Sequence, residues 1–363
     1  MTTNKKYQHF VPKFYLRFFS DDKKSVGTYI LKNKKYIKQA SLNSVGGADY
    51  LYGKDGTIED CFSEMEGKWN SIICKIINTE KIDLDLNEYF MLLTFIFFSD
   101  ARSKQVADSQ NEMINYFANV ANVLMNNDSF NEYSFDESLA KFNIPNYYPL
   151  SVVETVIPLF FDLKLSLLKN NTSSQFITSD CVLVKYNQYL LDNEFYFGYG
   201  YAAVGFQCFL PISPKLCLYL FDPAVYKHNE KNHIIQLNRN EDIYQLNKIF
   251  TYNSDEYLFF HHSTSENKIK TFLKNNEKQK RKNNSIFKTE DNEYMIMISQ
   301  KCINKNFNLN FVKFKENYRK KKIFIKSLQP PIRELPKKIM NDKENLPEEV
   351  LNKLEGKIFH LEK

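Results

Sequence analysis

The opening of the chain carries the most unusual set of side chains that could take part in chemistry. His9, Lys13 and Arg17 recur at four-residue intervals within a stretch rich in phenylalanine and tyrosine. A helix there would place Lys13 and Arg17 on one face, with His9 near its start and the aromatic side chains largely buried. A cation held against so much apolar surface needs an acidic partner or an anionic ligand. Arg17 therefore either binds an anion or pairs with Glu64 or Glu66.

A second pattern is typical of restriction-type nucleases, which use a carboxylate on one strand and an Asp/Glu-x-Lys triplet on the next. Two carboxylates would hold Mg²⁺ or Mn²⁺, and the lysine would polarise the attacking water. Asp180 ends a β-rich segment and Lys185 follows it closely. The triplets Glu66-Gly67-Lys68 and Asp162-Leu163-Lys164 also fit, but both fall in segments that we predict to be helical. Because 25% of the residues are charged, such triplets arise by chance, and the pattern favours a nuclease only weakly.

The histidines offer two further pairs. His261 and His262 are adjacent, and His228 lies five residues before His233. Adjacent side chains on a strand point to opposite faces, so we expect that His261 and His262 do not share one metal ion. A separation of five residues does not place two imidazoles on one helical face either. The sequence therefore argues against a metal site built from these histidines.

Positive charge is concentrated near the C-terminus. Of 49 lysines and arginines and 43 acidic residues, about 24 and 13 lie in residues 265–363, a local net charge of about +11 against about −5 elsewhere. Basic clusters of this kind contact phosphates without reading sequence. They are equally typical of a solvated face that resists aggregation. The candidate nucleic-acid-binding residues are Lys280, Arg281, Lys282, Arg319, Lys320, Lys321 and Lys322.

Several common classes of protein are excluded in their usual form. The chain has no Walker A loop, no Rossmann glycine series, no Gly-x-Ser-x-Gly elbow and no His-Glu-x-x-His. The longest apolar run, residues 89–98, is about half of the ~20 residues that a membrane-spanning helix needs. The N-terminus lacks the apolar core of a secretory signal, and the six cysteines are scattered. We therefore expect a cytoplasmic protein with reduced cysteines and no membrane partner.

The elements that must position these residues follow from the hydrophobic spacing. Apolar residues at three- and four-residue intervals predict helices, and β-rich runs between turn residues predict strands. The expected helices span residues 12–19, 58–77, 86–125 (one long helix or a broken pair), 159–168 and 242–250. The expected strands span residues 26–31, 35–38, 175–180, 182–186, 205–210, 216–221, 257–260 and 294–298.

This order of elements predicts an α+β fold. A helical N-terminal half would pack on a mainly antiparallel sheet, with a basic C-terminal appendage. We expect one domain over residues 5–260 and a basic extension over residues 261–363 packed on the same core.

The opening string Gln8-His9-Phe10-Val11-Pro12-Lys13-Phe14-Tyr15-Leu16-Arg17-Phe18-Phe19 resembles the signature of the bacterial DUF4238 family, a domain of unknown function. Later features resemble the family in order: Glu64-Met65-Glu66 on the first long helix, Arg102 after the second, Phe176-Ile177-Thr178-Ser179-Asp180, and the Leu210-Pro211-Ile212-Ser213-Pro214 turn, with Leu246-Asn247 as a further match. The likeness covers residues 5–260. One departure is that Cys181-Val182 follows Asp180 where the family has Asn-Pro, which puts the loop around this aspartate in doubt.

The resemblance implies a set of polar residues at motif positions but no established reaction. We hypothesise that they converge on one cleft, with His9 as acid or base, Glu66 and Asp180 as base or metal ligands, and arginines as anion clamps. The set is His9, Arg17, Glu66, Arg102, Ser179, Asp180 and Asn247.

Two functions remain open on this basis. One is a nucleic-acid-directed phosphodiesterase, a nuclease-like hydrolase using Mg²⁺ or Mn²⁺ in phage defence. The other is a non-enzymatic sensor or accessory subunit that binds nucleic acid or a partner protein from the same operon, with the polar residues forming a buried ion-pair network.

Overall fold

The structure is a computed structural model of the 363-residue chain. It describes residues 6–52, 54, 57–127, 150–152, 156–191, 200–274, 276, 285–288, 294–297, 303, 305–319 and 331–341. Within these ranges, no helix is both long and apolar enough to cross a membrane.

The opening segment folds into short elements, as the sequence predicts. Pro12 precedes α1 (Lys13–Leu16), which continues as the 3₁₀ helix η1 (Arg17–Phe19). The expected hairpin is confirmed as β2 (Ser25–Ile30) and β3 (Lys35–Ser41). Two three-residue strands, β1 (Tyr7–His9) and β4 (Gly47–Asp49), pair beside it.

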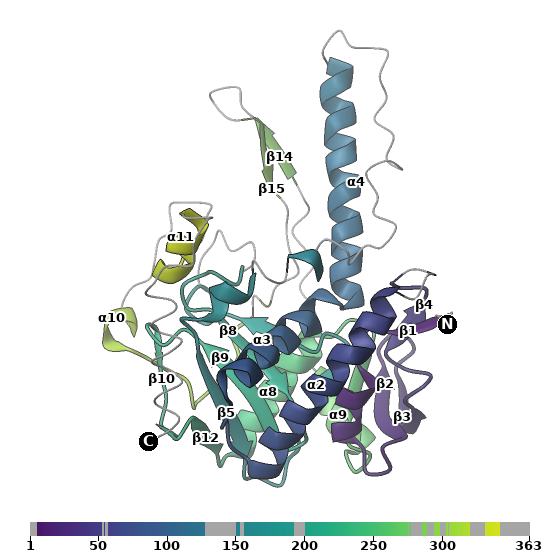
Figure 1. The fold of residues 1–363 in the computed structure, drawn as a ribbon, viewed down its shortest axis with the longest axis vertical. Coiled ribbons are helices and arrows are strands. Elements are labelled where there is room, and N and C mark those ends of the chain that lie inside the picture. The colour runs from purple at the N-terminus through teal and green to yellow at the C-terminus, as the bar shows by residue number, and fades with distance from the viewer. Residues whose placement is uncertain are drawn as a thin grey trace.

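Three long helices follow, and the expected broken pair is confirmed. They are α2 (Thr57–Thr79), α3 (Leu86–Ala101) and α4 (Lys104–Asn127). Asp85 starts α3 with a capping box, accepting from the Glu88 N–H while the Glu88 carboxylate accepts from the Asp85 N–H. The break at Arg102 and Ser103 lets α4 leave in a new direction, and Figure 1 shows it rising away from the body of the molecule.

A six-stranded sheet forms the centre of the fold. Its strand order is β11 (Glu230–Lys231), β12 (Ile234–Leu237), β5 (Lys164–Asn170), β9 (Leu216–Phe221), β8 (Gln207–Pro211), β7 (Val184–Tyr186). All neighbours are antiparallel except β12 and β5. The helix predicted over residues 159–168 was wrong, because this segment forms the 3₁₀ helix η2 (Ile157–Phe160) and then β5. An unbroken leucine-rich run suits a strand buried on both faces as well as it suits a helix.

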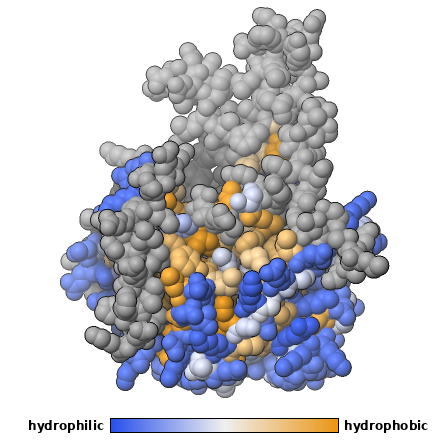
Figure 2. Space-filling model, in the orientation of Figure 1, coloured by the Kyte–Doolittle hydropathy of each residue, from blue (hydrophilic) through white to orange (hydrophobic). Residues whose placement is uncertain are grey.

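The central sheet is covered on both faces. Along β9, Leu216, Leu218 and Leu220 pack with the N-terminal helices, while Cys217, Tyr219 and Phe221 pack into a second cluster with α8 (Asn240–Asn253) and α9 (Glu266–Leu273). This alternation is the two-residue period of a strand. Helices therefore come from both halves of the chain, which corrects the prediction of a helical N-terminal half alone. Figure 1 shows α2 and α3 in front of the sheet and α8 and α9 behind it. Figure 2 shows hydrophobic residues gathered across the middle of the front face, above a hydrophilic rim.

A second sheet of four strands joins the N-terminal hairpin to later segments. Its order is β3, β2, β13 (Tyr257–Phe260), β6 (Thr178–Ser179), and all pairs are antiparallel. The Tyr15 hydroxyl links the two sheets, because it lies 2.7 Å from Thr178 Oγ1 in β6 and 2.5 Å from the Pro211 carbonyl oxygen in β8. Tyr15 thus lies between the two sheets and is fully buried.

The C-terminal third contributes several short elements to the described structure. Strand β10 (Tyr226–Lys227) pairs with β16 (Lys313–Phe314), and α10 (Glu316–Arg319) follows at once. A hairpin is formed by β14 (Ser285–Lys288) and β15 (Tyr294–Met297), the second of which was predicted. Helix α11 (Glu334–Asn341) follows Arg333, whose guanidinium binds the Asp162 carboxylate.

Replacement of Gly27 by alanine is expected to lower the free energy of unfolding by about 1–3 kcal/mol. A Cβ at this β2 position would lie 2.4 Å from the Phe260 ring and 2.6 Å from the Phe260 carbonyl oxygen in β13. Urea unfolding followed by circular dichroism measures the loss. Gly67→Ala in α2 is the matched control, because its Cβ would meet nothing within 4 Å. Helix propensity should make that variant about 0.5–1 kcal/mol more stable. Equal stability of the two variants would contradict the proposed close approach.

Candidate functional site

Arg102 is the centre of the first group of motif residues. Its side chain is only 2% exposed and lies at the end of α3. The guanidinium donates from Nη1 to Glu66 Oε1 at 2.9 Å, from Nη2 to the His9 carbonyl oxygen at 2.6 Å, and from Nε to the Tyr52 hydroxyl at 3.4 Å. It also stacks 4.3 Å from the centre of the Phe62 ring. Arg102 therefore ties the opening segment to α2 and α3.

His9 joins the same group through its backbone, while its ring has a separate contact. The imidazole is buried, and Nε2 lies 3.0 Å from the Leu42 carbonyl oxygen. The neighbouring Gln8 side chain accepts from the Tyr52 N–H at 2.6 Å, and the Tyr52 hydroxyl donates to the Arg102 carbonyl oxygen at 3.0 Å. Tyr52 was not singled out in the sequence, because a tyrosine in a turn has no distinctive pattern. These contacts close a buried hydrogen-bond network around the guanidinium.

Asp180 forms a second group at the end of β6. Its carboxylate is 4% exposed and accepts four backbone N–H groups. Oδ1 accepts from Cys181 at 3.1 Å and Asp255 at 2.8 Å, and Oδ2 accepts from Glu256 at 2.6 Å and Tyr257 at 3.1 Å. Burial raises the pKa of this carboxyl to about 6, against the lowering effect of the N–H donors. The aspartate therefore holds the turn that leads into β13.

The other motif residues beside Asp180 are also engaged. The Ser179 hydroxyl donates to the Cys181 carbonyl oxygen at 3.0 Å. The Asn247 amide on α8 accepts from the Ile177 N–H at 3.1 Å and donates to the Gln175 carbonyl oxygen at 2.8 Å. Both side chains fix the irregular backbone that precedes and follows β6. Six of the seven predicted site residues therefore divide into two hydrogen-bonded groups, one around Arg102 and one around Asp180.

The two groups are connected at the junction of α3 and α4. Lys104 pairs with Glu256, whose N–H binds Asp180, and the Cys181 thiol lies 3.2 Å from Gln105 Oε1. The assignment of Glu66 and Asp180 as metal ligands stays a prediction. In this structure the Glu66 oxygen accepts from a guanidinium and both Asp180 oxygens accept from N–H donors. A metal ion would have to displace these donors to bind the carboxylates.

Arg17 lies apart from both groups. Its side chain is exposed, and none of the described acidic side chains pairs with it. Of the two alternatives for Arg17, the pairing with Glu64 or Glu66 is therefore wrong, because Glu66 pairs with Arg102 and Glu64 with Lys68. The candidate nucleic-acid-binding residues Lys280, Arg281, Lys282, Lys320, Lys321 and Lys322 lie outside the described residues. Arg319 ends α10, and its side chain is not described.

The lysines of the nuclease-like pattern have other partners. Lys185 Nζ lies 2.6 Å from Asp100 Oδ2 and 5.2 Å from the centre of the Tyr201 ring, and the Tyr201 hydroxyl also donates to Asp100. Lys164 Nζ lies 2.7 Å from Glu230 Oε2. These contacts place Lys185 and Lys164 beside acids of other elements, whereas Lys68 pairs with Glu64 within α2.

One set of possible metal ligands within the described part of the chain was not predicted from the sequence. His261 Nε2 lies 2.8 Å from Asp21 Oδ1, and His262 Nδ1 lies 3.2 Å from Asp21 Oδ2. The argument that adjacent histidines diverge assumed a strand through both, whereas β13 ends at Phe260 and the next residues turn. The antiparallel register of β2 with β13 could have revealed Asp21, since it brings the residues before Gly27 beside those after Phe260.

Comparison with known proteins gives a family and no activity. A family model described as "Protein of unknown function (DUF4238)" matches residues 7–264. No curated protein and no solved structure gives a significant match. The matched region runs from β1 to the turn that follows His261 and His262, so it contains both polar groups. Since that region is well over half of the 363 residues, the chain belongs to the DUF4238 family, as the opening string indicates.

Proposed function

We propose that this protein binds nucleic acid without cleaving it, and that its motif residues stabilise the fold instead of catalysing a reaction. The observation that carries the proposal is the complete engagement of Arg102 and Asp180 in buried contacts. A catalytic acid, base or anion clamp must reach the substrate. Here, access to substrate would require breaking hydrogen bonds that hold the opening segment and the β6–β13 turn.

Positive charge supports nucleic acid as the partner. In the β10–β16 ladder, Lys227 lies directly opposite Lys313, and both side chains are exposed. Like charges opposite one another in an antiparallel pair destabilise it, and a bound phosphate would relieve the repulsion. Among the described residues, neither lysine has an ion-pair partner. Lys313 lies just before α10 and the Arg319–Lys322 run of the sequence, within residues 265–363, which carry a net charge of about +11.

The test is fluorescence anisotropy with labelled single-stranded RNA, single-stranded DNA and duplex DNA of equal length, measured over a series of salt concentrations. We expect an association constant whose logarithm falls linearly with the logarithm of the salt concentration. Lys227→Ala with Lys313→Ala should weaken binding to all sequences and reduce the salt slope by about 1–2. Lys35→Ala with Lys38→Ala is the matched control, since these are exposed lysines of β3, and it should leave the slope unchanged.

The same samples, incubated with Mg²⁺ or Mn²⁺, test the competing proposal of a nuclease-like hydrolase. We expect intact nucleic acid after incubation. Cleavage that disappears in a folded His9→Gln variant would establish the hydrolase instead and place its site at the opening segment. Absence of binding to all three probes at low salt would overturn the proposed function.

A further inference from the structure

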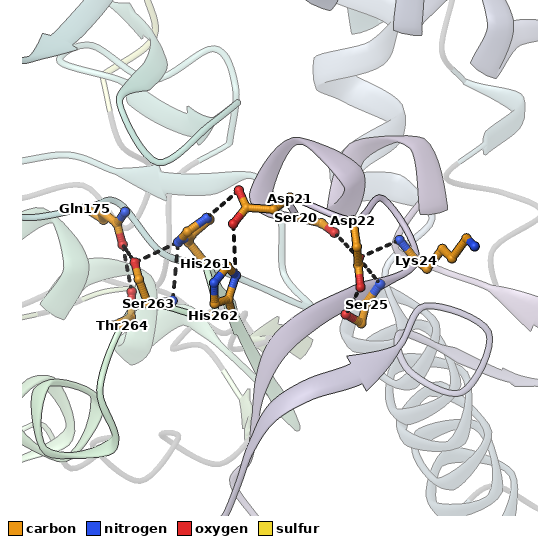
Figure 3. A network of polar contacts seen from close by, with 10 residues as sticks. All are labelled: Ser20, Asp21, Asp22, Lys24, Ser25, Gln175, His261, His262, Ser263 and Thr264. Atoms are coloured by element: carbon orange, nitrogen blue, oxygen red, sulfur yellow. Dashed lines mark hydrogen bonds and ion pairs between the residues drawn. The ribbon is translucent and has the colours of Figure 1, made fainter.

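We propose that Asp21, His261 and His262 bind a divalent first-row transition-metal ion, with Zn²⁺ as the probe of the site. The inference rests on side chains that neither polar group uses and that the sequence pattern assigned to no site. It is independent of the proposed nucleic-acid binding. Figure 3 shows both imidazoles pointing at the carboxylate of Asp21, each toward a different oxygen.

The backbone brings the three residues together by strand register. Strand β2 pairs with β13 so that Gly27 lies opposite Phe260. Because the pair is antiparallel, the loop entering β2 lies beside the loop leaving β13. Asp21 belongs to the first loop and the two histidines belong to the second. The site therefore bridges the loop before β2 and the loop after β13. The ligands therefore sit on loops anchored by paired strands, which limits the movement needed for binding.

The adjacent Asp22 holds the first loop in place. Its Oδ1 accepts from Ser20 Oγ at 2.9 Å and from the Lys24 and Ser25 N–H groups at 2.8 Å each, while Oδ2 accepts from Ser25 Oγ at 2.6 Å. These hydrogen bonds lower the pKa of Asp22, the largest part coming from the Ser25 hydroxyl. With Asp22 committed to its own loop, Asp21 is left to face the histidines, and Figure 3 shows the Lys24 side chain extending away from them.

The distances suit a small cation with nitrogen and oxygen ligands. One ligand atom from each residue lies within 4.8 Å of the other two, and the two nitrogen–oxygen distances to Asp21 are 2.8 and 3.2 Å. Zn²⁺ bonds of about 2.0–2.2 Å in a tetrahedral site separate neighbouring ligand atoms by roughly 3.3–3.6 Å. Small side-chain shifts thus convert the contacts into coordination bonds. Two imidazoles and one carboxylate leave at least one position for water.

The groups behind His261 match the usual support of a metal ligand. His261 Nδ1 lies 2.7 Å from Ser263 Oγ, so the ring nitrogen away from Asp21 already has a hydroxyl partner. Ser263 and Thr264 in turn donate to Gln175 Oε1 at 3.2 and 3.0 Å. Metal-binding histidines ordinarily use their second nitrogen in this way, which orients the ring and fixes its tautomer. The side chains of His261 and His262 are 17% and 31% exposed, and Asp21 is 65% exposed, so an ion can enter from solvent.

The experiment titrates Zn²⁺ into the full chain, prepared without an affinity tag and stripped with EDTA, by isothermal titration calorimetry at pH 7.5. We expect one saturable Zn²⁺ site per chain in every preparation of the folded wild type. His262→Gln and Asp21→Asn should each weaken Zn²⁺ binding at least about tenfold, because each removes a ligand. Ser263→Ala should weaken it by about tenfold through the orientation of His261.

The matched control is His233→Gln, a partly exposed histidine between β11 and β12 of the six-stranded sheet that lies beside Glu230. It should leave Zn²⁺ binding unchanged. Thermal unfolding of each metal-free variant shows whether it is folded before titration. No saturable binding by the wild type overturns the proposal, and so does wild-type affinity in folded His262→Gln and Asp21→Asn. In either case the three side chains form only a hydrogen-bonded cluster at the surface. Nucleic-acid binding measured in EDTA does not depend on this result.

Discussion

Arg102→Ala is expected to lower the free energy of unfolding by about 3–5 kcal/mol. The guanidinium is 2% exposed and supplies donors to Glu66, to the His9 carbonyl oxygen and to the Tyr52 hydroxyl. Its removal leaves a buried carbonyl oxygen and part of a carboxylate without donors, and it opens a cavity beside Phe62. Urea unfolding at pH 7, followed by circular dichroism, measures the loss.

Two further variants separate packing from charge in this prediction. Arg102→Met fills most of the cavity, and in combination with Glu66→Leu it also removes the unpaired acid. We expect the double variant to recover a substantial part of the stability lost in Arg102→Ala, because hydrophobic replacement of a whole buried ion pair is often tolerated. The structural role of Arg102 would be contradicted by an alanine variant that unfolds like the wild type but no longer binds nucleic acid.

The opening string shows why a family signature need not mark an active site. Phe10, Val11, Phe14, Tyr15 and Leu16 are all buried, and Tyr15 joins the two sheets through its hydroxyl. A segment that packs between two sheets and several helices is constrained at nearly every position by its neighbours. Most of the string is therefore explained by packing and hydrogen bonding, and two of its polar members, Gln8 and His9, take part in that network, whereas Arg17 is exposed.

Local elements of the fold were predictable because their patterns are local. The hairpin β2–β3, the helices α2, α3 and α8, and the strand β13 follow from the spacing of apolar residues within each segment. The prediction of a helix over residues 159–168, where β5 (Lys164–Asn170) lies, failed for a physical reason. A central strand buried on both faces has no polar side to produce alternation, so its leucines do not distinguish strand from helix.

The partners of charged residues were not predictable, because they depend on long-range contacts. Arg102 and Glu66 were both singled out, yet their pairing was not predicted, and Glu66 was considered only as one possible partner of Arg17. The pairs formed by Lys185 with Asp100 and by Arg333 with Asp162 span 85 and 171 residues. Sequence spacing within one helix carries no information on such pairs. The same limit hid Asp21, which becomes a neighbour of His261 and His262 only through the register of β2 with β13.

Asp180→Asn is expected to destabilise the protein by at least about 2 kcal/mol, almost as much as Asp180→Ala. Both carboxylate oxygens accept backbone N–H groups, from Asp255 on one side and from Glu256 and Tyr257 on the other. An asparagine NH₂ group at either position would face donors and leave them without an acceptor. A purely catalytic aspartate would behave differently, since its asparagine variant keeps its stability and loses activity. Urea unfolding of both variants at pH 7.5 makes the distinction.

The pH dependence of stability provides an independent check on the same residue. Burial raises the pKa of Asp180 from 3.8 to about 6, so the folded chain holds this proton more tightly than the unfolded chain does. The stabilisation from protonated Asp180 is therefore fully present below about pH 4 and is lost as the pH rises through about 6. The difference in unfolding free energy between wild type and Asp180→Asn should accordingly shrink from pH 4 to pH 7, because only the wild type titrates at this position. A difference that does not change with pH would mean that the N–H donors offset the effect of burial on the pKa of Asp180.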